Sequence, residues 1–179
     1  MKFKTGHAGH TNDIEKLFLN TFTASEGEEE GRIVSQLTSR LMQSDQQQDI
    51  LCCTAWDAET LLGCIFFSRL RFPKDSRSVF ILAPVAVATA QQGRGTGQAL
   101  IRFGLDEIKA QDCDVALTYG DPAYYGKVGF RAITTDEVAP PLPLQYPEGW
   151  LGQSLSNAEL EPLIGPSQCV EAFNDPSLW

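Results

Sequence analysis

A glycine-rich turn separates an apolar stretch from an amphipathic one. The apolar stretch covers residues 78–88, the amphipathic stretch covers 95–110, and residues 91–97 between them read Gln-Gln-Gly-Arg-Gly-Thr-Gly. Where a strand runs through a tight turn into a helix, free backbone N–H groups and the positive helix end converge on one point. The three alternate glycines let a ligand approach those amides closely, and Arg94 adds a positive charge. The turn therefore predicts a binding site for a phosphate group.

Two familiar phosphate-binding loops do not fit this spacing. The dinucleotide fingerprint Gly-x-Gly-x-x-Gly needs glycine at position 98 or 100, where Gln98 and Leu100 stand. The nucleoside-triphosphate loop needs Gly-Lys-Ser/Thr, which the sequence lacks. A plain strand-to-helix turn that uses glycine only for its geometry is the alternative interpretation.

Two segments resemble the GNAT superfamily of acetyl-CoA-dependent N-acetyltransferases. Residues 92–97 are similar to its Gln/Arg-x-x-Gly-x-Gly/Ala signature, and residues 82–87 look like the strand that precedes it. Residues 125–130, Tyr-Gly-Lys-Val-Gly-Phe, are similar to the family's Tyr-x-x-x-Gly-Phe pattern. With residues 120–124 they resemble a subgroup of largely uncharacterised bacterial acetyltransferases. Thr89 departs from the pattern, because many relatives have proline there.

The resemblance implies which residues bind acetyl-CoA, the acetyl donor, with no metal. The pyrophosphate of CoA would lie on the amides of the turn, and the pantetheine arm would pair with the strand backbone around Val85 and Val87. Pro84 cannot donate a backbone hydrogen bond and suits a bulge that separates this strand from the next, with or without a ligand. The implied cofactor-binding residues are Val85, Val87, Gln92, Gly93, Arg94, Gly95, Thr96 and Gly97.

The resemblance also implies direct attack of a neutral amine on the thioester within a ternary complex. The backbone N–H near Val87 would stabilise the oxyanion. Tyr125 matches the general acid that protonates the leaving thiolate, and Tyr124 is expected to pack nearby or to line the acceptor site. The strand 79–87 offers no carboxylate, so the base that deprotonates the amine is either water or Glu30. The helix dipole equally explains an acidic residue such as Glu30 at the start of a helix.

The chain has few of the residues that other catalytic chemistries need. His7 and His10 are the only histidines, so neither a His-based triad nor a His-rich metal site is expected. The five cysteines form an odd set without a Cys-x-x-Cys pair, and four of them sit among apolar residues. We expect reduced, buried thiols rather than a disulfide framework or thiol catalysis.

The charge distribution argues against a broad basic binding face. The net charge is −9, and only residues 69–131 are net positive, with nine basic and six acidic side chains. Nucleic acids and anionic membranes select broad basic surfaces, so neither is an expected partner. Residues 132–179 carry seven acidic and no basic side chains. With the run 28–30 they favour a cationic acceptor, although ordinary solvated surfaces explain the same charges.

Hydrophobic patterning predicts an α/β or α+β layered fold. Helical spacing of apolar residues predicts two N-terminal helices, the first opened by a capping box of Asn12 and Glu15 and the second preceded by the acidic run 26–30. The 78–88 strand is apolar on both faces and is therefore expected to be central. Asp121 and Pro122 predict the start of a short helix. β-rich runs predict strands at 50–56 and 61–72, joined as a hairpin, and at 78–88, 113–119 and 128–133.

The family resemblance implies a mixed, mostly antiparallel central sheet flanked by helices. We expect one N-acetyltransferase domain over residues 1–179, with 132–179 a loop-rich extension packed on it, because that segment holds seven of the ten prolines. We expect this extension to bury Trp150 and Leu151 and to return as a strand at 168–173. Trp150 and Trp179 would cover either the core or a homodimer interface.

The predicted function is transfer of an acetyl group from acetyl-CoA to a primary amine of a small molecule or peptide. The longest apolar run, 79–90, is too short to span a bilayer, and the N-terminus lacks a secretory signal, so we expect a soluble cytoplasmic protein. A non-catalytic acyl-CoA-binding or sensing module is one alternative. A nucleotide-binding protein unrelated to CoA is another, which the loop spacing disfavours.

Overall fold

The computed structural model describes residues 1–156 and 158–179, which form two compact units. The first contains residues 1–67 and 84–104, and the second contains 68–83 and 105–179. The strands are β1 (Lys2–Thr5), β2 (Ile50–Asp57), β3 (Thr60–Leu70), β4 (Val79–Val87), β5 (Val115–Tyr119), β6 (Arg131–Ala132) and β7 (Trp150–Ser154). They are hydrogen-bonded in the order β1-β2-β3-β4-β5-β7-β6, with β4 and β5 parallel and the β1–β2, β5–β7 and β6–β7 pairs antiparallel. The predicted mixed sheet with flanking helices is confirmed, and the single-domain interpretation stays a prediction.

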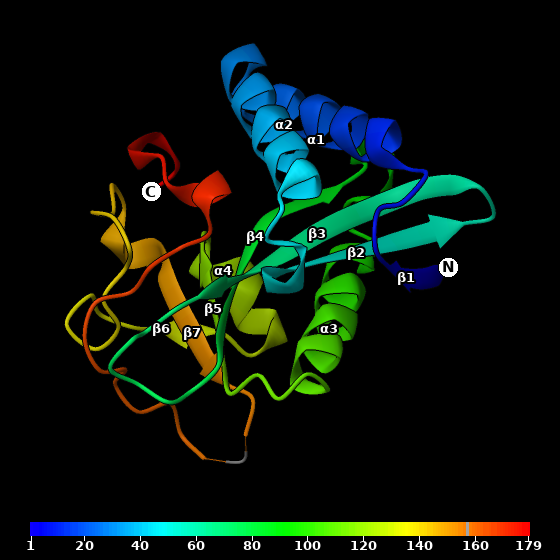
Figure 1. Cartoon of the computed structure of the whole chain (residues 1–179). Coiled ribbons are helices and arrows are strands. Elements are labelled where there is room, and N and C mark those ends of the chain that lie inside the picture. Colours follow the sequence, from blue (N-terminus) through cyan, green and yellow to red (C-terminus); the bar gives the residue numbers. More distant parts are fainter. Residues whose placement is uncertain (157) are drawn as a thin grey trace. The chain divides into compact units, whose positions relative to one another are not determined.

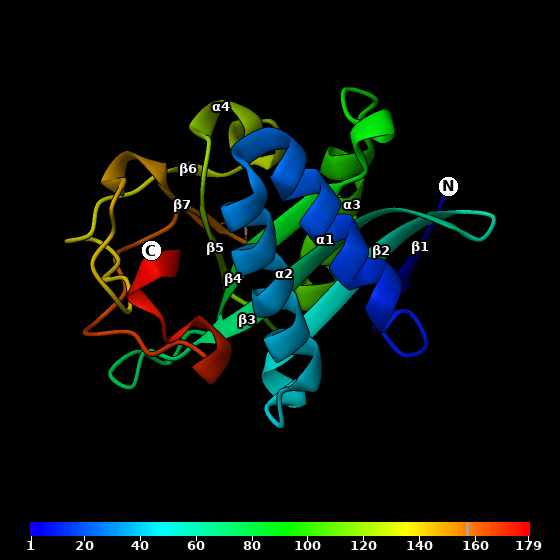
Figure 2. The same ribbon diagram turned by 90° about the horizontal axis from the view of Figure 1, so that it is seen from above.

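Two helices cover one face of the sheet in the first unit. Figures 1 and 2 show α1 and α2 side by side over β2 and β3. The buried residues Ile14 and Phe18 of α1, and Leu37 and Leu41 of α2, lie on the predicted apolar faces. The elements are α1 (Thr11–Glu26), α2 (Glu28–Gln43), β2 (Ile50–Asp57) and β3 (Thr60–Leu70), and the predicted hairpin is confirmed.

The capping box predicted at Asn12 and Glu15 is wrong. Helix α1 begins at Thr11, so its N-cap is His10, two residues before Asn12, and the His10 side chain makes no capping hydrogen bond. The His10 ring packs instead on Trp56 of β2, with the ring centroids 4.4 Å apart, and its Nδ1 lies 3.8 Å from Asp13 Oδ2. Helix α1 therefore begins next to the contact between His10 and Trp56, without a side-chain cap.

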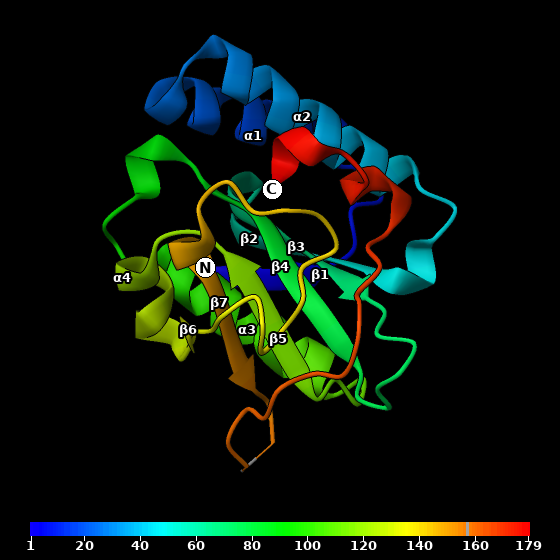
Figure 3. The ribbon, with the colours of Figure 1, turned by 90° about the vertical axis from the view of Figure 1, so that its left-hand side faces the viewer.

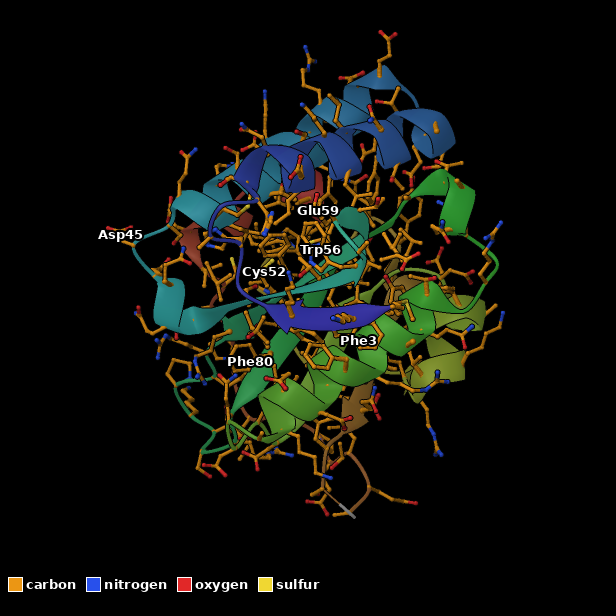
Figure 4. All side chains as sticks on the ribbon, turned by 90° about the vertical axis from the view of Figure 1, so that its right-hand side faces the viewer. Phe3, Asp45, Cys52, Trp56, Glu59 and Phe80 are labelled. Atoms are coloured by element: carbon orange, nitrogen blue, oxygen red, sulfur yellow. The ribbon has the colours of Figure 1, made fainter. Side chains whose placement is uncertain are left out.

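Strand β1 (Lys2–Thr5) is not predicted by the sequence, because a four-residue strand with one large apolar side chain gives little signal. It pairs antiparallel with β2, with Lys2 opposite Trp56. Phe3 stacks on Phe103 of α3 (Thr96–Lys109), with ring centroids 5.2 Å apart. Figure 4 shows Phe3 on the α3 side of β1, and Cys52 and Trp56 on the side of α1 and α2.

Strands β4 and β5 follow the prediction, whereas the next strand does not. Strand β4 (Val79–Val87) lies in the middle of the strand order, as predicted, and β5 covers Val115–Tyr119. The predicted strand 128–133 shrinks to β6 (Arg131–Ala132). The chain before it forms a 3-10 turn, and Gly129 adopts a left-handed φ of +97°, which interrupts an extended strand.

The C-terminal extension is loop-rich as predicted, but its strand lies elsewhere. Strand β7 (Trp150–Ser154) pairs with β5 and β6, as Figure 3 shows. The strand predicted at 168–173 is wrong, since residues 171–173 form a 3-10 turn and Gln168 makes a single bridge to Arg71. The consecutive residues Ala172 and Phe173 are both buried, whereas neighbouring side chains of a strand point to opposite faces.

Both tryptophans of the extension fill the interior of the second unit. Trp150 is 0% exposed and Trp179 is 1% exposed, and their rings meet edge to face with centroids 6.3 Å apart. Leu151 is also buried, as predicted. These side chains therefore belong to the core of one copy rather than to an interface.

Within the described residues, no helix has the length and apolar character needed to cross a membrane. The same residues contain no group of three or more His, Cys, Asp or Glu side chains placed to hold a metal ion. Four of the five cysteines, Cys52, Cys53, Cys64 and Cys113, are buried, as predicted.

The close packing of α1 on α2 depends on Gly31. A Cβ at Gly31 would lie 2.8 Å from Leu19 O and 2.9 Å from Thr23 N, and it would also collide with Thr23 Oγ1. We expect Gly31→Ala to push the helices apart and lower the free energy of unfolding by about 1–3 kcal/mol in urea titration. Gly126→Ala is the control, because a Cβ there meets nothing within 4 Å. Equal stabilities of the two variants would contradict this account of the packing.

Candidate functional site

Strand β4 ends at Val87, whose carbonyl is held by two side chains. Thr21 Oγ1 of α1 donates to Val87 O at 3.4 Å, and Gln92 Nε2 donates to the same oxygen at 3.1 Å. Ala88 N donates to Leu62 O at 2.9 Å, which fixes the chain as it leaves the sheet. The sequence points to Gln92 but not to Thr21, because a threonine on a helix face carries no motif. These bonds fix the point from which the glycine turn begins.

Two glycines of the turn adopt conformations that other residues rarely take. After the 3-10 turn Thr89–Gln91, Gly93 has φ +72° and Gly95 has φ +81°. A Cβ at either position would meet nothing within 4 Å. Backbone geometry thus explains both glycines, and the space beside them is open to a ligand.

The start of α3 leaves backbone donors unused by the helix. The first helical hydrogen bond runs from Ala99 N to Gly95 O at 3.0 Å, so the N–H groups of residues 96–98 precede the helical ladder. The first turn of α3 contains no acidic residue that would neutralise its positive end. Thr96 and Gly97 are buried, whereas Arg94 is exposed in the turn. This arrangement can bind an anion such as a phosphate.

The β4 backbone continues beyond its pairing with β5. The parallel register joins Val79–Leu82 to Val115–Thr118 and ends two residues before Pro84. Val85 is half-buried and Val87 is buried. Their predicted pairing with a pantetheine arm, and the predicted bulge at Pro84, stay predictions.

Tyr125 belongs to the second unit, at the end of α4 (Pro122–Tyr125), which starts as predicted. Asp121 Oδ1 accepts a hydrogen bond from Ala123 N at 2.8 Å and caps this short helix. The Tyr125 ring meets Tyr124 and Phe130 edge to face, with centroids 5.1 Å and 5.9 Å away. The packing explanation and the predicted catalytic role are both compatible with these contacts.

The Tyr125 phenol is held in its neutral form. Burial, followed by the neighbouring Tyr124 and Asp121, raises its pKa to about 12, and a hydrogen bond with Thr118 lowers the pKa by less. Thr118 Oγ1 donates to Leu82 O at 2.8 Å, which fixes the Thr118 side chain. Tyr125 therefore carries a proton throughout the neutral pH range. The sequence gives no signal for the supporting residue Thr118.

Glu30 lies in the first turn of α2 and is half-buried. Burial, then the charges of Glu26 and Glu29, raise the pKa of its carboxyl. A carboxylate with a raised pKa is a stronger base than an exposed one, which suits the predicted role. Its position at the N-terminal end of a helix explains the same residue without catalysis.

Gly120 leaves room for the Tyr125 ring. A Cβ at Gly120 would lie 2.7 Å from Cε2 of Tyr125 and 3.4 Å from its Cδ2. We expect Gly120→Ala to displace the ring and to shift the NMR signals of the Tyr125 ring protons, with about 1–3 kcal/mol lower stability. Gly126→Ala should leave the ring packing unchanged, since that Cβ meets open space. Unmoved Tyr125 signals in Gly120→Ala would show that the ring is not confined there.

Residues 11–130 match the model of the Acetyltransferase (GNAT) family. The chain is 30% identical over 142 residues to the uncharacterized N-acetyltransferase YjhQ of Escherichia coli K12, an alignment that covers 76% of this chain and 78% of YjhQ.

Solved structures share the fold. The crystal structure of YhbS, a GNAT family N-acetyltransferase from Escherichia coli in complex with CoA, has a TM-score of 0.78 at 22% identity and covers 97% of this chain and 92% of its own. A GNAT family acetyltransferase from Brucella melitensis in complex with acetyl-CoA has a TM-score of 0.69, also at 22% identity, with 97% of each chain covered. The family match over residues 11–130 includes the motifs at 92–97 and 125–130. The chain belongs to the GNAT family of acetyltransferases.

Proposed function

We propose that this protein transfers the acetyl group of acetyl-CoA to a primary amine of a small molecule or peptide. The observation that carries the proposal is the start of α3, where the N–H groups of residues 96–98 precede the helical ladder and no acidic residue opposes an anion. The open space beside Gly93 and Gly95 fits a bulky phosphate ligand. The CoA and acetyl-CoA complexes of structurally similar proteins support this choice of ligand.

The residues proposed to hold acetyl-CoA form one continuous segment. The turn amides and Arg94 would bind the pyrophosphate, because the amides donate hydrogen bonds and the guanidinium supplies charge. The backbone of Val85 and Val87 would hold the pantetheine arm. Bound acetyl-CoA supplies an acetyl group already activated as a thioester. The full proposed set is Val85, Val87, Gln92, Gly93, Arg94, Gly95, Thr96 and Gly97.

Tyr125 is the proposed general acid. Its Oη keeps a proton at neutral pH, because burial raises its pKa to about 12. A protonated phenol can give that proton to a leaving group during the transfer. The backbone N–H near Val87 would stabilise the developing negative charge.

The acceptor amine must reach the reaction neutral, so a base has to take its proton. Water or Glu30 fills this role in the proposal, and the raised pKa of Glu30 suits it. The acidic balance of the chain, net −9, favours a cationic acceptor. The proposal treats residues 1–179 as one N-acetyltransferase domain, with the extension 132–179 beyond the part that matches the family model.

Gly95→Glu tests the cofactor site. The variant places a bulky carboxylate in the turn, so we expect it to lose the thermal shift that acetyl-CoA gives the wild type. At about 100 times the Kd that shift should be roughly 5 to 10 °C, from roughly 2.7 kcal/mol of binding free energy. CoA should also stabilise the wild type, whereas ATP and NAD should not. Each shift is measured from the variant's own unliganded Tm, because a left-handed φ of +81° disfavours glutamate.

Gln111→Glu is the matched control for charge, because it adds one carboxylate at an exposed position just after α3 ends. It should keep the acetyl-CoA shift. A wild type that saturating acetyl-CoA does not stabilise, or a Gly95→Glu variant that responds fully, would contradict the proposed cofactor site.

Tyr125→Phe tests the catalytic role. We expect kcat to fall about 100-fold to 10,000-fold, the usual contribution of a general acid, while the acetyl-CoA Kd stays within about 2-fold. The wild-type kcat should rise as the amine loses its proton and should not fall between about pH 8 and 10, because Tyr125 stays protonated until its pKa of about 12.

Tyr124→Phe is the neighbouring control and should keep most of the wild-type kcat. Unchanged turnover in Tyr125→Phe would remove Tyr125 from the mechanism. A wild type that binds acetyl-CoA but turns over no amine in a broad acceptor screen would favour the non-catalytic acyl-CoA-binding module instead.

A further inference from the structure

A hollow of about 380 Å³ opens where β1 and β2 meet the segment that precedes α1. Its lining side chains include Lys4, His7 and His10, together with Gln47 and Cys52. His7 Nε2 lies 3.2 Å from Gln47 Oε1. None of the lining residues belongs to β4, to the glycine turn or to α3. The hollow is therefore separate from the proposed cofactor site.

Two thiols lie close together behind this hollow. Cys52 Sγ on β2 is 3.6 Å from Cys64 Sγ on β3. All three thiols of these two strands are buried, with Cys52 3% exposed and Cys53 and Cys64 0% exposed, and Cys52 is the one that lines the hollow. Figure 4 shows Cys52 on the face of β2 turned toward α1 and α2. A small molecule that enters the hollow thus meets Cys52 first.

The two thiols have different surroundings. The ionisable side chains that line the hollow beside Cys52 are Lys4, His7 and His10, and no carboxylate is among the described lining residues. Cys64 is 0% exposed, and burial, then its hydrogen bond with Cys52, raises the pKa of its thiol well above the usual value. Because Cys52 lines the hollow and Cys64 does not, Cys52 is the attacking thiol of the pair and Cys64 the second.

We propose that Cys52 and Cys64 are a redox modification site, which a hydroperoxide entering the hollow converts to a reversible disulfide. The Cys52 thiolate attacks one peroxide oxygen, the O–O bond breaks, and Cys52 becomes a sulfenic acid while the other oxygen leaves as water. Cys64 sulfur then attacks Cys52 sulfur, forms the S–S bond and expels the second oxygen as water, which takes the Cys64 proton. In total, two thiols and one hydrogen peroxide give one disulfide and two waters.

The movement that this reaction needs is small. The sulfurs must approach from 3.6 Å to about 2.05 Å. Cys64 directly follows Gly63, where a Cβ would lie 3.1 Å from Ala86 O of β4, so β3 is packed tightly at this point. We therefore expect β2 to move, because one strand, β1, separates it from the edge of the sheet. This inference does not rest on acetyl transfer.

The test treats the folded protein with hydrogen peroxide and measures its mass. We expect the pair to lose about 2 Da, the two hydrogens removed, in addition to any oxygen that Cys169 gains, and dithiothreitol to reverse this loss. Trypsin and a glutamate-specific protease then cut after Arg40, Glu59 and Arg69, which separates residues 41–59 from 60–69. Only a disulfide joins these two peptides. Because residues 41–59 contain both Cys52 and Cys53, variants must identify the partner.

Cys53→Ala should still give the joined peptides, and both Cys52→Ala and Cys64→Ala should not. The half-buried Cys169 serves as an internal control, since its oxidation shows that peroxide was active. Joined peptides that persist in Cys52→Ala, or peptides that stay separate in folded wild type while Cys169 is oxidised, would overturn the proposal. Far-ultraviolet circular dichroism of each variant before treatment confirms that the comparison is made on folded protein.

Discussion

The carbonyl of Val87 is the point on which the proposed cofactor site depends. It ends β4 and accepts hydrogen bonds from Thr21 of α1 and from Gln92 of the turn. The chain must then enter α3 at Thr96, and two left-handed glycines, Gly93 and Gly95, make so short a path possible. The same path leaves the first N–H groups of α3 outside the helical ladder. A local backbone constraint thus leaves the donors that the proposed site uses, and the first turn of α3 contains no acidic side chain to oppose an anion.

The proposed chemistry divides between segments that are far apart in the sequence. The turn supplies donors for a polyanion, while Tyr125, held by Thr118 and by aromatic neighbours, supplies a proton that burial keeps in place. The Tyr125 pKa of about 12 lies above the ordinary thiol pKa of about 8.5, so proton transfer to a leaving thiolate is favourable only where burial raises the thiol pKa as well.

Much of the fold was predictable because long, periodic segments were involved. The α1 and α2 faces, the hairpin and the central β4 all follow from apolar spacing, and the motif at 92–97 identified the turn. Strand β1 was not predictable from the sequence, because it forms through its pairing with β2 and the contact between Phe3 and Phe103. The extension was predicted to be loop-rich, but its strand was placed wrongly, because β7 is determined by its partners β5 and β6 rather than by local composition. Thr21 and Thr118 act through hydrogen bonds to residues far along the chain, which no local sequence pattern predicts.

The central claim is that the turn before α3 seats the pyrophosphate of acetyl-CoA. A crystal structure of the protein grown with acetyl-CoA tests it most directly. The account predicts pyrophosphate oxygens about 2.7–3.2 Å from backbone nitrogens between Gly93 and Gln98, with the φ angles of Gly93 and Gly95 still positive. Acetyl-CoA bound elsewhere on the chain, with these nitrogens facing only water, would contradict the account and leave the glycines as a device of the fold alone.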